Sequence, residues 1–366
     1  MTSSQNHFKA TTPHVVAKHA LLAGYLSAWF SILGKGRYPR LVYVDGFAGP
    51  GKFEDRTDGS PVRALKVARG FVPPLSAELH FFFIEKSRAF AEHLKREIPA
   101  LQLPQNFKWK VEQGTFEEVV PAILDELDRG ELAGAPVFAF VDPFGVKGAP
   151  FDLIRRILAR PSSEVFVTFM NEGVRRCIEG YPQHVDALLG AEGASESIAR
   201  ATDKVASARQ LYRGALDSTR AHVCVFQVRD ARNRPIYDLF FATHSERGLI
   251  KMKEAMWKVD RSGFFLFSDA KDPAQQSFFS EIPGERFAPL LWEKFKGRRV
   301  NIEEIVRFAD LSPTYLSSHA RAAIQAMERA HGVSGKHVRV ERAPCKGGRR
   351  ASLRQFPIGT TVEFLE

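Results

Sequence analysis

A glycine-rich loop follows the first strongly apolar segment of the chain. Leu41–Val44 leads into Asp45, and three glycines follow at Gly46, Gly49 and Gly51. An acid at the end of a buried strand, followed by such a loop, is typical of sites where the backbone approaches a nucleoside or a phosphate. The loop therefore predicts a binding site for one of these two groups.

The phosphate interpretation matches only part of a P-loop. Residues 46–52, GFAGPGK, fit the pattern G-x-x-x-x-G-K, but Phe53 stands where a hydroxyl residue must bind magnesium. Pro50 removes an N–H group from the loop, and Ser60 before Pro61 indicates that the next helix begins only there. A P-loop NTPase is the less favoured interpretation. It remains an alternative because VFAFVD at 137–142 resembles the strand and the Asp that hold magnesium in NTPases.

The nucleoside interpretation rests on the spacing D-x-F-x-G-x-G. It resembles the first motif of class I S-adenosylmethionine-dependent methyltransferases, in the Phe version found in enzymes that act on nucleic-acid bases. Glycines would let the backbone approach the methionine and ribose portions of the cofactor, and an acid could accept a hydrogen bond from its ammonium group. We expect Asp45, Gly46, Phe47, Gly49 and Gly51 to bind S-adenosylmethionine.

The ends of later strands supply further candidates for the same site. The segment 78–85 ends in Glu85, at the position where Rossmann-like folds hold the ribose hydroxyls. Capping the helix that follows Ser87 is the alternative role for this acid. The segment 107–114 is followed by Thr115, where the methyltransferases that the chain resembles contact adenine.

The loop VDPFG, which ends the strand at 136–142, carries the candidate catalytic residues Asp142, Pro143 and Phe144. It resembles the D-P-P-Y or D-P-P-F loop of base-amino methyltransferases, although one proline is absent and the aromatic residue is shifted. Asp142 would orient and polarise the acceptor and Phe144 would pack against it, because methyl transfer depends largely on positioning. The alternative is structural, with Asp142 capping the helix near Phe151 and Phe144 lining the core.

These loops need a sheet that brings the strand ends together. Strands and helices alternate, which predicts a doubly wound, Rossmann-like α/β sheet. Two later segments, 221–230 and 236–244, flank ARNRP and predict an antiparallel hairpin. The strands of the first part and the helices between them are expected at 40–45, 78–85, 107–114, 136–142 and 164–170, and at 61–69, 87–97, 116–129 and 151–159.

Length and composition set further limits. A chain of 366 residues, 44% of them hydrophobic, predicts two domains: 1–284, methyltransferase-like with a helical lead-in at 1–38, and 285–366. Three scattered cysteines argue against a disulfide framework, a zinc site or an iron–sulfur site, and we expect no metal and a cytoplasmic location. The apolar segment 21–34 is too short to span a membrane, so it predicts a buried helix with Lys18 and His19 on its first turn.

Most of the net charge of +10 lies near the C-terminus. Residues 294–355 contain 14 lysines and arginines against five acidic residues, which indicates a surface for a polyanion. Helices expected at 285–297, 301–309 and 313–332, the last capped by Ser312 and closed by Gly332, precede a basic two-stranded wing. This predicts a winged helix-turn-helix with nucleic-acid contacts at Tyr315, Ser318, His319, Arg321, Lys346, Arg349 and Arg350.

A basic domain of this kind can also bind a protein instead of nucleic acid. Six separated phrases, in order along most of the chain, resemble the three-Cys-motif partner protein (TcmP) family: KHALLAGYLSAWF, YVDGFAGPGKF, GSPVRAL, FFFIEKS, FVDPFG and FFATHSERGLIKMKEAMWKVD. The resemblance implies a methyltransferase-like protein with a C-terminal winged helix and a partner that carries a radical-S-adenosylmethionine-type three-cysteine motif. Three hypotheses remain: a nucleic-acid methyltransferase, a non-catalytic module that binds the cofactor and nucleic acid, and a P-loop NTPase.

Overall fold

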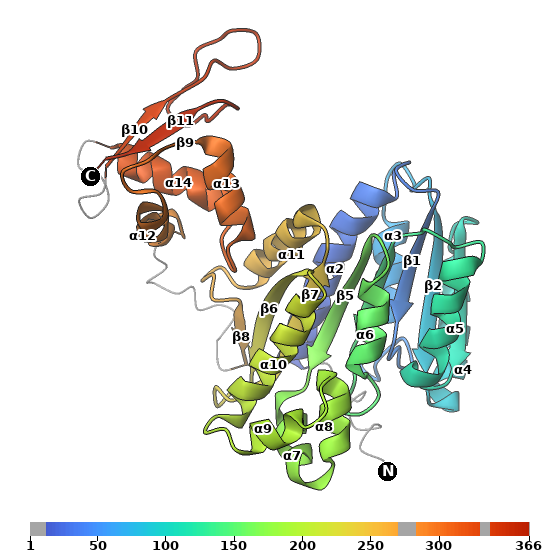
Figure 1. Ribbon diagram of the computed structural model, residues 1–366. Helices are drawn as coiled ribbons and strands as arrows, with labels where there is room; N and C mark the ends of the chain where they lie inside the picture. Colours follow the sequence, from blue (N-terminus) through green and yellow to red (C-terminus); the bar gives the residue numbers. More distant parts are fainter. Residues whose placement is uncertain (1–11, 270–282, 330–336, 366) are drawn as a thin grey trace. The chain divides into compact units, whose positions relative to one another are not determined.

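The computed structural model describes residues 12–269, 283–329 and 337–365 of the chain. The described residues form two compact units (Figure 1). Unit 1 comprises 12–259 and 266–269, and unit 2 comprises 260–265 together with the described residues from 283 onward. The segment 260–265, which the sequence analysis places in the first domain, is therefore part of the second unit.

Unit 1 contains a mixed sheet and the helices around it. Its elements in chain order are α2 (Pro13–Leu33), β1 (Arg40–Asp45), α3 (Ser60–Arg69), β2 (Glu78–Glu85), α4 (Arg88–Glu97), the 3₁₀ helix η1 (Pro99–Leu101), β3 (Phe107–Gln113), α5 (Phe116–Arg129), β4 (Val137–Val141), α6 (Phe151–Leu158), β5 (Ser163–Phe169), α7 (Asn171–Gly180), α8 (Pro182–Leu189), α9 (Ala194–Ala199), α10 (Lys204–Ser218), β6 (His222–Arg229), β7 (Pro235–Thr243), α11 (Glu246–Val259) and β8 (Leu266–Ser268).

The strands form one sheet in the order β3-β2-β1-β4-β5-β7-β6-β8. The first five are parallel, and β7 runs antiparallel to β5 on one side and to β6 on the other. In register, Val44 of β1 lies between Phe82 of β2 and Ala139 of β4. The chain moves outward from β1 to β3 and then returns to β4 beside β1, so a switch point lies between β1 and β4. The predicted α/β class and the antiparallel hairpin are confirmed.

Helices cover both faces of this sheet (Figure 1). The side chains of β1 alternate between these two faces. Val42 and Val44 belong to a core that includes residues of α5, α6 and α10. Tyr43 points to the other face, where its ring stacks on Phe138 at a centroid distance of 6.0 Å. Tyr25 of α2 packs on the same Phe138 ring at 5.4 Å. Each buried strand therefore contributes to two apolar layers.

Helix α2 is a core helix of unit 1. Among the described residues it is the one helix with the length and hydropathy to cross a membrane, yet Leu21, Leu22 and Leu26 are fully buried inside the unit. Its first residue is Pro13, so Lys18 and His19 lie on its second turn and not on the first turn as predicted. Both side chains line a pocket at the carboxyl ends of the parallel strands.

Unit 2 has its own core and a small sheet. Its elements are α12 (Pro283–Phe295), β9 (Arg299–Asn301), α13 (Ile302–Leu311), α14 (Ser317–Glu328), β10 (Val338–Glu341) and β11 (Thr361–Phe364). The strands pair antiparallel in the order β10-β11-β9, so the sheet has one strand more than the predicted wing.

The third helix of unit 2 begins later than predicted. The Asp310 carboxylate accepts a hydrogen bond from the Ser317 N–H at 2.8 Å, and the His319 ring accepts one from the Leu316 N–H at 3.1 Å. These contacts begin α14 at Ser317, and the expected start at Ser312 and Pro313 is wrong. The predicted end at Gly332 lies outside the described residues.

Candidate functional site

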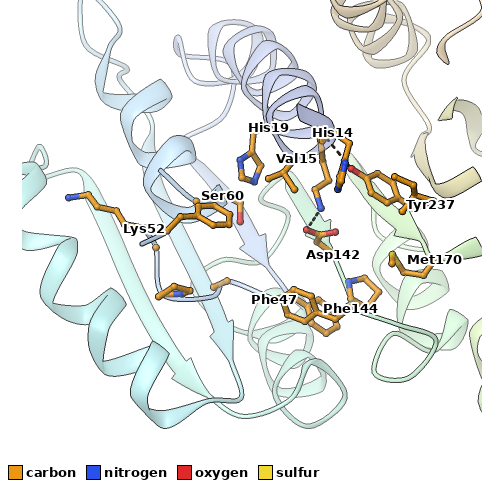
Figure 2. Close-up of a pocket in the computed structure, with 18 residues that line it drawn as sticks. His14, Val15, His19, Phe47, Lys52, Ser60, Asp142, Phe144, Met170 and Tyr237 are labelled. Atoms are coloured by element: carbon orange, nitrogen blue, oxygen red, sulfur yellow. Dashed lines mark hydrogen bonds and ion pairs between the residues drawn. The ribbon is translucent and has the colours of Figure 1, made fainter. Parts of the chain in front are cut away.

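Two pockets lie at the carboxyl ends of the parallel strands, next to the switch point. One has a volume of about 160 Å³ and includes residues of α2 in its wall, and we call it the α2 pocket. The other has a volume of about 430 Å³ and includes Glu85, and we call it the Glu85 pocket. Phe47 and Phe144 line both pockets, so the two cavities adjoin at these two rings. Figure 2 shows the α2 pocket, with the two rings side by side.

Glu85 is held rigidly in the wall of its pocket. One carboxylate oxygen accepts the Gly49 N–H at 2.9 Å, and the other accepts the Ser87 N–H at 2.7 Å. Burial raises the pKa of Glu85, and the two backbone hydrogen bonds oppose that rise. Each oxygen keeps further lone-pair capacity, so the carboxylate can still accept hydrogen bonds from ligand hydroxyls. Glu85 can therefore hold the start of the helix after Ser87 and still be available for the predicted contact with a ligand.

The glycines of the opening loop are required by close packing. A Cβ on Gly46 would lie 2.5 Å from the Phe116 ring, and a Cβ on Gly51 would lie 2.6 Å from the Leu94 side chain. Gly51 also has a φ of 83°, in the region that favours glycine. Gly46 lines the Glu85 pocket and Gly51 lines the α2 pocket, whereas Gly49 lines neither and uses its N–H to hold Glu85.

Asp45 does not line either pocket, which corrects the prediction of a direct ligand contact. Its side chain is completely buried, with the Tyr43 hydroxyl 3.3 Å from one oxygen and the Phe47 N–H 3.4 Å from the other. Burial raises the pKa of Asp45 to about 7. The acid therefore supports the base of the loop from inside the protein, because the last residue of β1 points into the core rather than toward the loop opening.

Thr115 lies in the wall of the Glu85 pocket and also caps α5. Its hydroxyl oxygen accepts the Glu118 N–H at 3.3 Å, and the Glu118 carboxylate accepts the Thr115 N–H at 2.9 Å. This reciprocal capping box fixes the start of the helix. Hydrogen bonds from the Thr115 N–H and from the Thr115 side chain to the Glu118 carboxylate lower the pKa of Glu118.

Asp142 is paired with a lysine that the sequence analysis did not select for the site. The Lys18 ammonium of α2 donates to the Asp142 carboxylate at 2.5 Å, and the Lys18 side chain is only 9% exposed. Figure 2 labels Asp142 and marks this contact with a dashed line. The same ammonium lies 5.2 Å from the centroid of the Tyr237 ring. The partners are 124 residues apart, and a single lysine on an apolar helix gives no sequence signal for such a pair.

Phe144 is the accessible aromatic residue of the catalytic loop. Its side chain is 40% exposed, and Pro143 before it also lines the α2 pocket. Phe47, across the junction, stacks on Phe116 with ring centroids 5.8 Å apart. Phe47 is therefore anchored, and Phe144 presents a ring face to whatever enters. The structural alternative for Phe144, a place in the core, is wrong.

His19 and Tyr237 add neutral polar side chains to the wall of the α2 pocket. Burial, followed by the nearby charges of Lys18 and Arg63, lowers the pKa of His19 to about 3, so this ring is neutral at physiological pH. The Tyr237 hydroxyl donates to the His14 carbonyl at 3.1 Å. The α2 pocket thus combines the neutral His19 ring with the Lys18–Asp142 pair and with Lys52, which is paired with Glu97.

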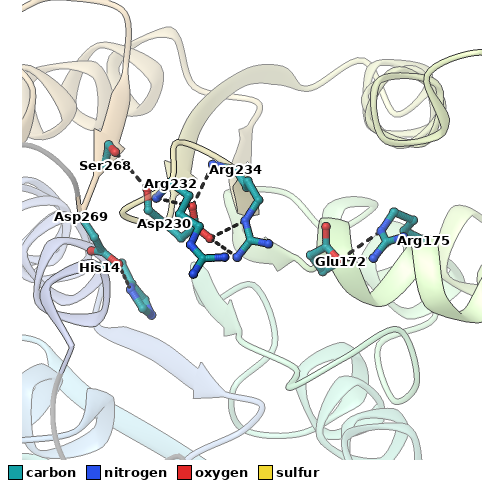
Figure 3. A network of polar contacts seen from close by, with 8 residues as sticks. All are labelled: His14, Glu172, Arg175, Asp230, Arg232, Arg234, Ser268 and Asp269. Atoms are coloured by element: carbon teal, nitrogen blue, oxygen red, sulfur yellow. Dashed lines mark hydrogen bonds and ion pairs between the residues drawn. The ribbon is translucent and has the colours of Figure 1, made fainter.

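A tight turn with several polar contacts joins β6 to β7 (Figure 3). The Asp230 carboxylate accepts the N–H groups of Arg232 and Arg234, each at 2.9 Å, and the Arg234 side chain at 2.8 Å. The Ser268 hydroxyl donates to the Asp230 carbonyl at 3.2 Å, which joins β8 to the turn. These contacts order the turn that leads into β7, the strand that carries Tyr237.

Geometry disfavours the P-loop alternative. The Lys52 ammonium lies 2.5 Å from the Glu97 carboxylate, and Lys52 forms a β-bridge with Asp58. The next helix, α3, begins only at Ser60, so the N–H groups of a helix N-terminus do not follow the lysine directly. Within the described ranges, no group of three or more His, Cys, Asp or Glu side chains could hold a metal ion. All three cysteines are free.

Three of the predicted nucleic-acid residues near the start of α14, Tyr315, His319 and Arg321, have structural roles, whereas Ser318 is exposed. Tyr315 is 8% exposed and stacks on Phe287, with ring centroids 4.1 Å apart, so the expectation that it faces outward is wrong. The Arg321 guanidinium donates to the Phe356 carbonyl at 3.1 Å, and His319 caps the helix. The late start of α14 explains the difference, because it places Tyr315 before the helix, against the core.

The predicted wing residues have a different environment. Lys346, Arg349 and Arg350 are exposed on the turn between β10 and β11. The Arg349 carbonyl accepts the Cys345 N–H at 2.8 Å, which closes this turn. Gly347 and Gly348 adopt positive φ values of 80° and 73°. The three cations therefore extend from an ordered turn whose shape depends on two glycines.

Comparisons with known proteins give distant structural likenesses. No family model and no curated protein match the chain, so membership of the TcmP family stays a prediction. A Legionella pneumophila protein of the family model DUF519 is 15% identical over 63% of this chain and 84% of its own, with a TM-score of 0.37. An O-methyltransferase from Bacillus cereus in complex with SAH is 12% identical over 66% and 86%, and the DszA carbon methyltransferase is 12% identical over 64% and 55%, both with a TM-score of 0.36. At these scores the likenesses carry no argument about function.

Proposed function

We propose that the chain is an S-adenosylmethionine-dependent methyltransferase. The observation that carries the proposal is the pair of adjoining pockets at the switch point, one lined by Glu85 and the other by Asp142, with Phe47 and Phe144 shared between them. A cofactor pocket that opens onto an acceptor pocket is the arrangement that direct transfer between two ligands requires. The strand order, with antiparallel β7 between β5 and β6, is that of the class I methyltransferase fold.

The residues of the Glu85 pocket fit the nucleoside part of this cofactor. Gly46 and Gly114 place main-chain atoms in its wall, and Glu85 offers acceptors for ribose hydroxyls. Its volume of about 430 Å³ is within the range of small-molecule sites. When bound, the cofactor supplies a methyl group on a sulfonium, which is already a good leaving group. The protein therefore needs to bind and orient more than to move protons.

Asp142 and Lys18 would orient the methyl acceptor. The carboxylate oxygen that receives Lys18 can accept a second hydrogen bond, and the other oxygen can do the same. An acceptor amino group that donates to Asp142 would then be held beside the Phe144 ring, whose exposed face can pack against a planar group. Lys18 keeps the position of the carboxylate fixed before the acceptor arrives.

We further propose a nucleic-acid base as the acceptor. An acid next to an exposed aromatic residue suits a planar amine, and unit 2 supplies exposed cations at Lys346, Arg349 and Arg350. The order helix, strand, two helices and two strands in unit 2 is the order of a winged helix. The proposed three-Cys-motif partner rests on the resemblance in sequence, and the proposed cytoplasmic location rests on the three scattered cysteines.

The second candidate is a binding module without catalysis. The Lys18–Asp142 pair favours it, because the lysine already takes one hydrogen-bonding position of the carboxylate and partly neutralises its charge. In that case S-adenosylmethionine would bind and no methyl group would be transferred.

Methyl transfer from labelled cofactor separates the two candidates. The full chain is incubated with S-adenosylmethionine labelled in its methyl group and with bulk DNA, tRNA or rRNA. We expect label in one of these acceptors, and we expect Asp142→Asn to reduce the rate about 100-fold, with cofactor affinity within about threefold. Asp152→Asn, an exposed acid on α6, is the control and should retain full activity. Cofactor binding without transfer to any of the three acceptors would favour the module.

A further inference from the structure

A separate cavity of about 300 Å³ lies at the opposite edge of the sheet, and we call it the amino-edge cavity. Ser163 begins β5 and Thr243 ends the antiparallel β7, so both mark the edge where the parallel strands start. The last turns of α2 and the first turn of α11 complete the wall. All of these residues belong to unit 1, and the cavity shares none of them with the two pockets at the carboxyl edge.

Basic side chains gather at this cavity. Arg37, Arg247 and Lys251 line it, and the two arginines are exposed. The Lys251 ammonium is paired with the Glu254 carboxylate at 2.7 Å. Neither arginine forms an ion pair with an acid in the part of the chain that the structure describes. Two guanidinium groups are therefore available to an anion at this position.

The N-terminus of α11 adds to the positive potential. This helix has 14 residues, and Arg247 and Gly248 of its first turn lie in the cavity wall. The Ser245 hydroxyl oxygen accepts the Gly248 N–H at 3.1 Å and orders the turn. A helix N-terminus carries a partial positive charge that favours an anion near it.

Two buried polar groups in the same wall have no protein partner. The Ser163 hydroxyl and the Trp29 indole N–H form no hydrogen bond within the described residues, although the side chains are 0% and 3% exposed. A buried polar atom without a partner destabilises the protein, so a ligand that forms a hydrogen bond with it gains affinity. These groups point to a ligand with a polar atom that reaches past the cations.

The polar groups at the floor of the cavity already form hydrogen bonds with one another. The Tyr25 hydroxyl donates to one oxygen of Glu164 at 2.5 Å, and the Thr243 hydroxyl donates to the other at 2.7 Å. Glu164 is 6% exposed, so its carboxyl group belongs to the interior. The acidic group of a ligand is therefore directed to the arginines at the rim and away from Glu164.

We propose that the amino-edge cavity binds a small organic anion with a planar apolar body. Its acidic group pairs with Arg37 and Arg247, and its body lies along Trp29, Ile32 and Leu33 of α2. A polar atom at its inner end meets the Ser163 hydroxyl. The site is independent of the proposed methyl transfer, since it uses other residues at the other edge of the sheet.

A fluorescent aromatic sulfonate tests the proposal. 8-Anilinonaphthalene-1-sulfonate combines an anionic group with a planar apolar body, and it emits strongly only in apolar surroundings. We expect the full chain to bind it at one saturable site. The double variant Arg37→Glu, Arg247→Glu should weaken binding at least tenfold, because two attractive charges become repulsive.

Controls separate the site from general hydrophobic binding. Arg96→Glu changes the charge of an exposed arginine on α4 and should leave the affinity within twofold. S-adenosylmethionine affinity should be the same in the double variant as in the native chain, so this result does not depend on the proposed function. Absence of saturable binding, or equal affinity in a folded double variant, would overturn the proposal.

Discussion

The two edges of the sheet in unit 1 contain similar residues that have different roles. Each has a buried acid with a pKa raised to about 7 by burial, Asp45 at the carboxyl edge and Glu164 at the amino edge. Each also has a glycine that a side chain would disrupt, Gly46 and Gly248. At the carboxyl edge the buried acid lies beneath the loop and other acids, Glu85 and Asp142, line the pockets.

At the amino edge the buried acid is itself part of the cavity wall, and the charges at the rim are positive. The carboxyl edge therefore offers hydrogen-bond acceptors to hydroxyl and amino groups, and the amino edge attracts anions. The difference shows that position relative to the strand ends, rather than residue type, decides what a buried acid does in this fold.

The glycines give the largest expected effect on stability. Gly46→Ala would place a Cβ 2.5 Å from the Phe116 ring, and Gly248→Ala would place one 2.5 Å from the Glu164 carboxylate. We expect each substitution to lower the free energy of unfolding by about 1–3 kcal/mol, measured by chemical denaturation. Gly145 also lines the Glu85 pocket, but a Cβ added there would meet no atom within 4 Å, so Gly145→Ala should change stability by less than about 0.5 kcal/mol. Equal effects at all three positions would refute close packing as the reason for these glycines.

The two buried acids predict how stability changes with pH. Because the pKa of Glu164 rises from 4.5 to about 7 on folding, the folded chain keeps a proton that the unfolded chain releases between these values. Stability should therefore fall as the pH rises through this window, by at most about 1.4 kcal/mol per pH unit for each such group. Glu164→Gln should flatten the profile between about pH 4.5 and 7, as followed by thermal denaturation. Asp45→Asn should flatten it over a similar window that begins near the lower ordinary pKa of aspartate, 3.8. An unchanged slope in both variants would contradict burial of the charged forms.

The smallest expected effect concerns the wing of unit 2, and it is a change in the salt dependence of nucleic-acid affinity. If Lys346, Arg349 and Arg350 contact phosphates, replacing all three with alanine should reduce the slope of log affinity against log salt by about two to three. Removing three exposed cations of unit 1, Lys95, Arg96 and Arg129, serves as the control and should leave the slope unchanged. The measurement is fluorescence anisotropy with labelled DNA and RNA at several salt concentrations. An unaltered slope in the wing variant would move the proposal toward a protein-binding surface.

The sequence predicted most of the carboxyl edge because its signals are local. Strands such as 78–85 carry long apolar runs, and Glu85 and Asp142 stand directly at or after strand ends, where parallel topology brings them together. The strand bounds agree with the structure to within one residue at either end. The burial of the Asp45 side chain was not predictable in the same way, because it depends on the contacts with Tyr43 and the Phe47 N–H that form only on folding.

Contacts between distant segments were not accessible to sequence reasoning. The pair of Lys18 and Asp142 depends on how α2 crosses the sheet, and no spacing in the sequence records that crossing. The same holds for the amino-edge cavity, where Arg37, Ser163 and Arg247 meet only after folding. In unit 2 the hydrogen bonds of Asp310 and His319 shifted the start of α14, although Ser312 and Pro313 form a typical helix-start pair.

The most direct test of the central claim is calorimetric titration of the full chain with S-adenosylmethionine. We expect one site per chain, and we expect Glu85→Ala to weaken binding about tenfold or more through the loss of charge-assisted hydrogen bonds to the ribose. Glu92→Ala, an exposed acid on α4, should bind as tightly as the native chain. Equal affinity in the Glu85 variant would remove this residue from the site. Tighter binding of ATP with magnesium than of S-adenosylmethionine would contradict the methyltransferase account.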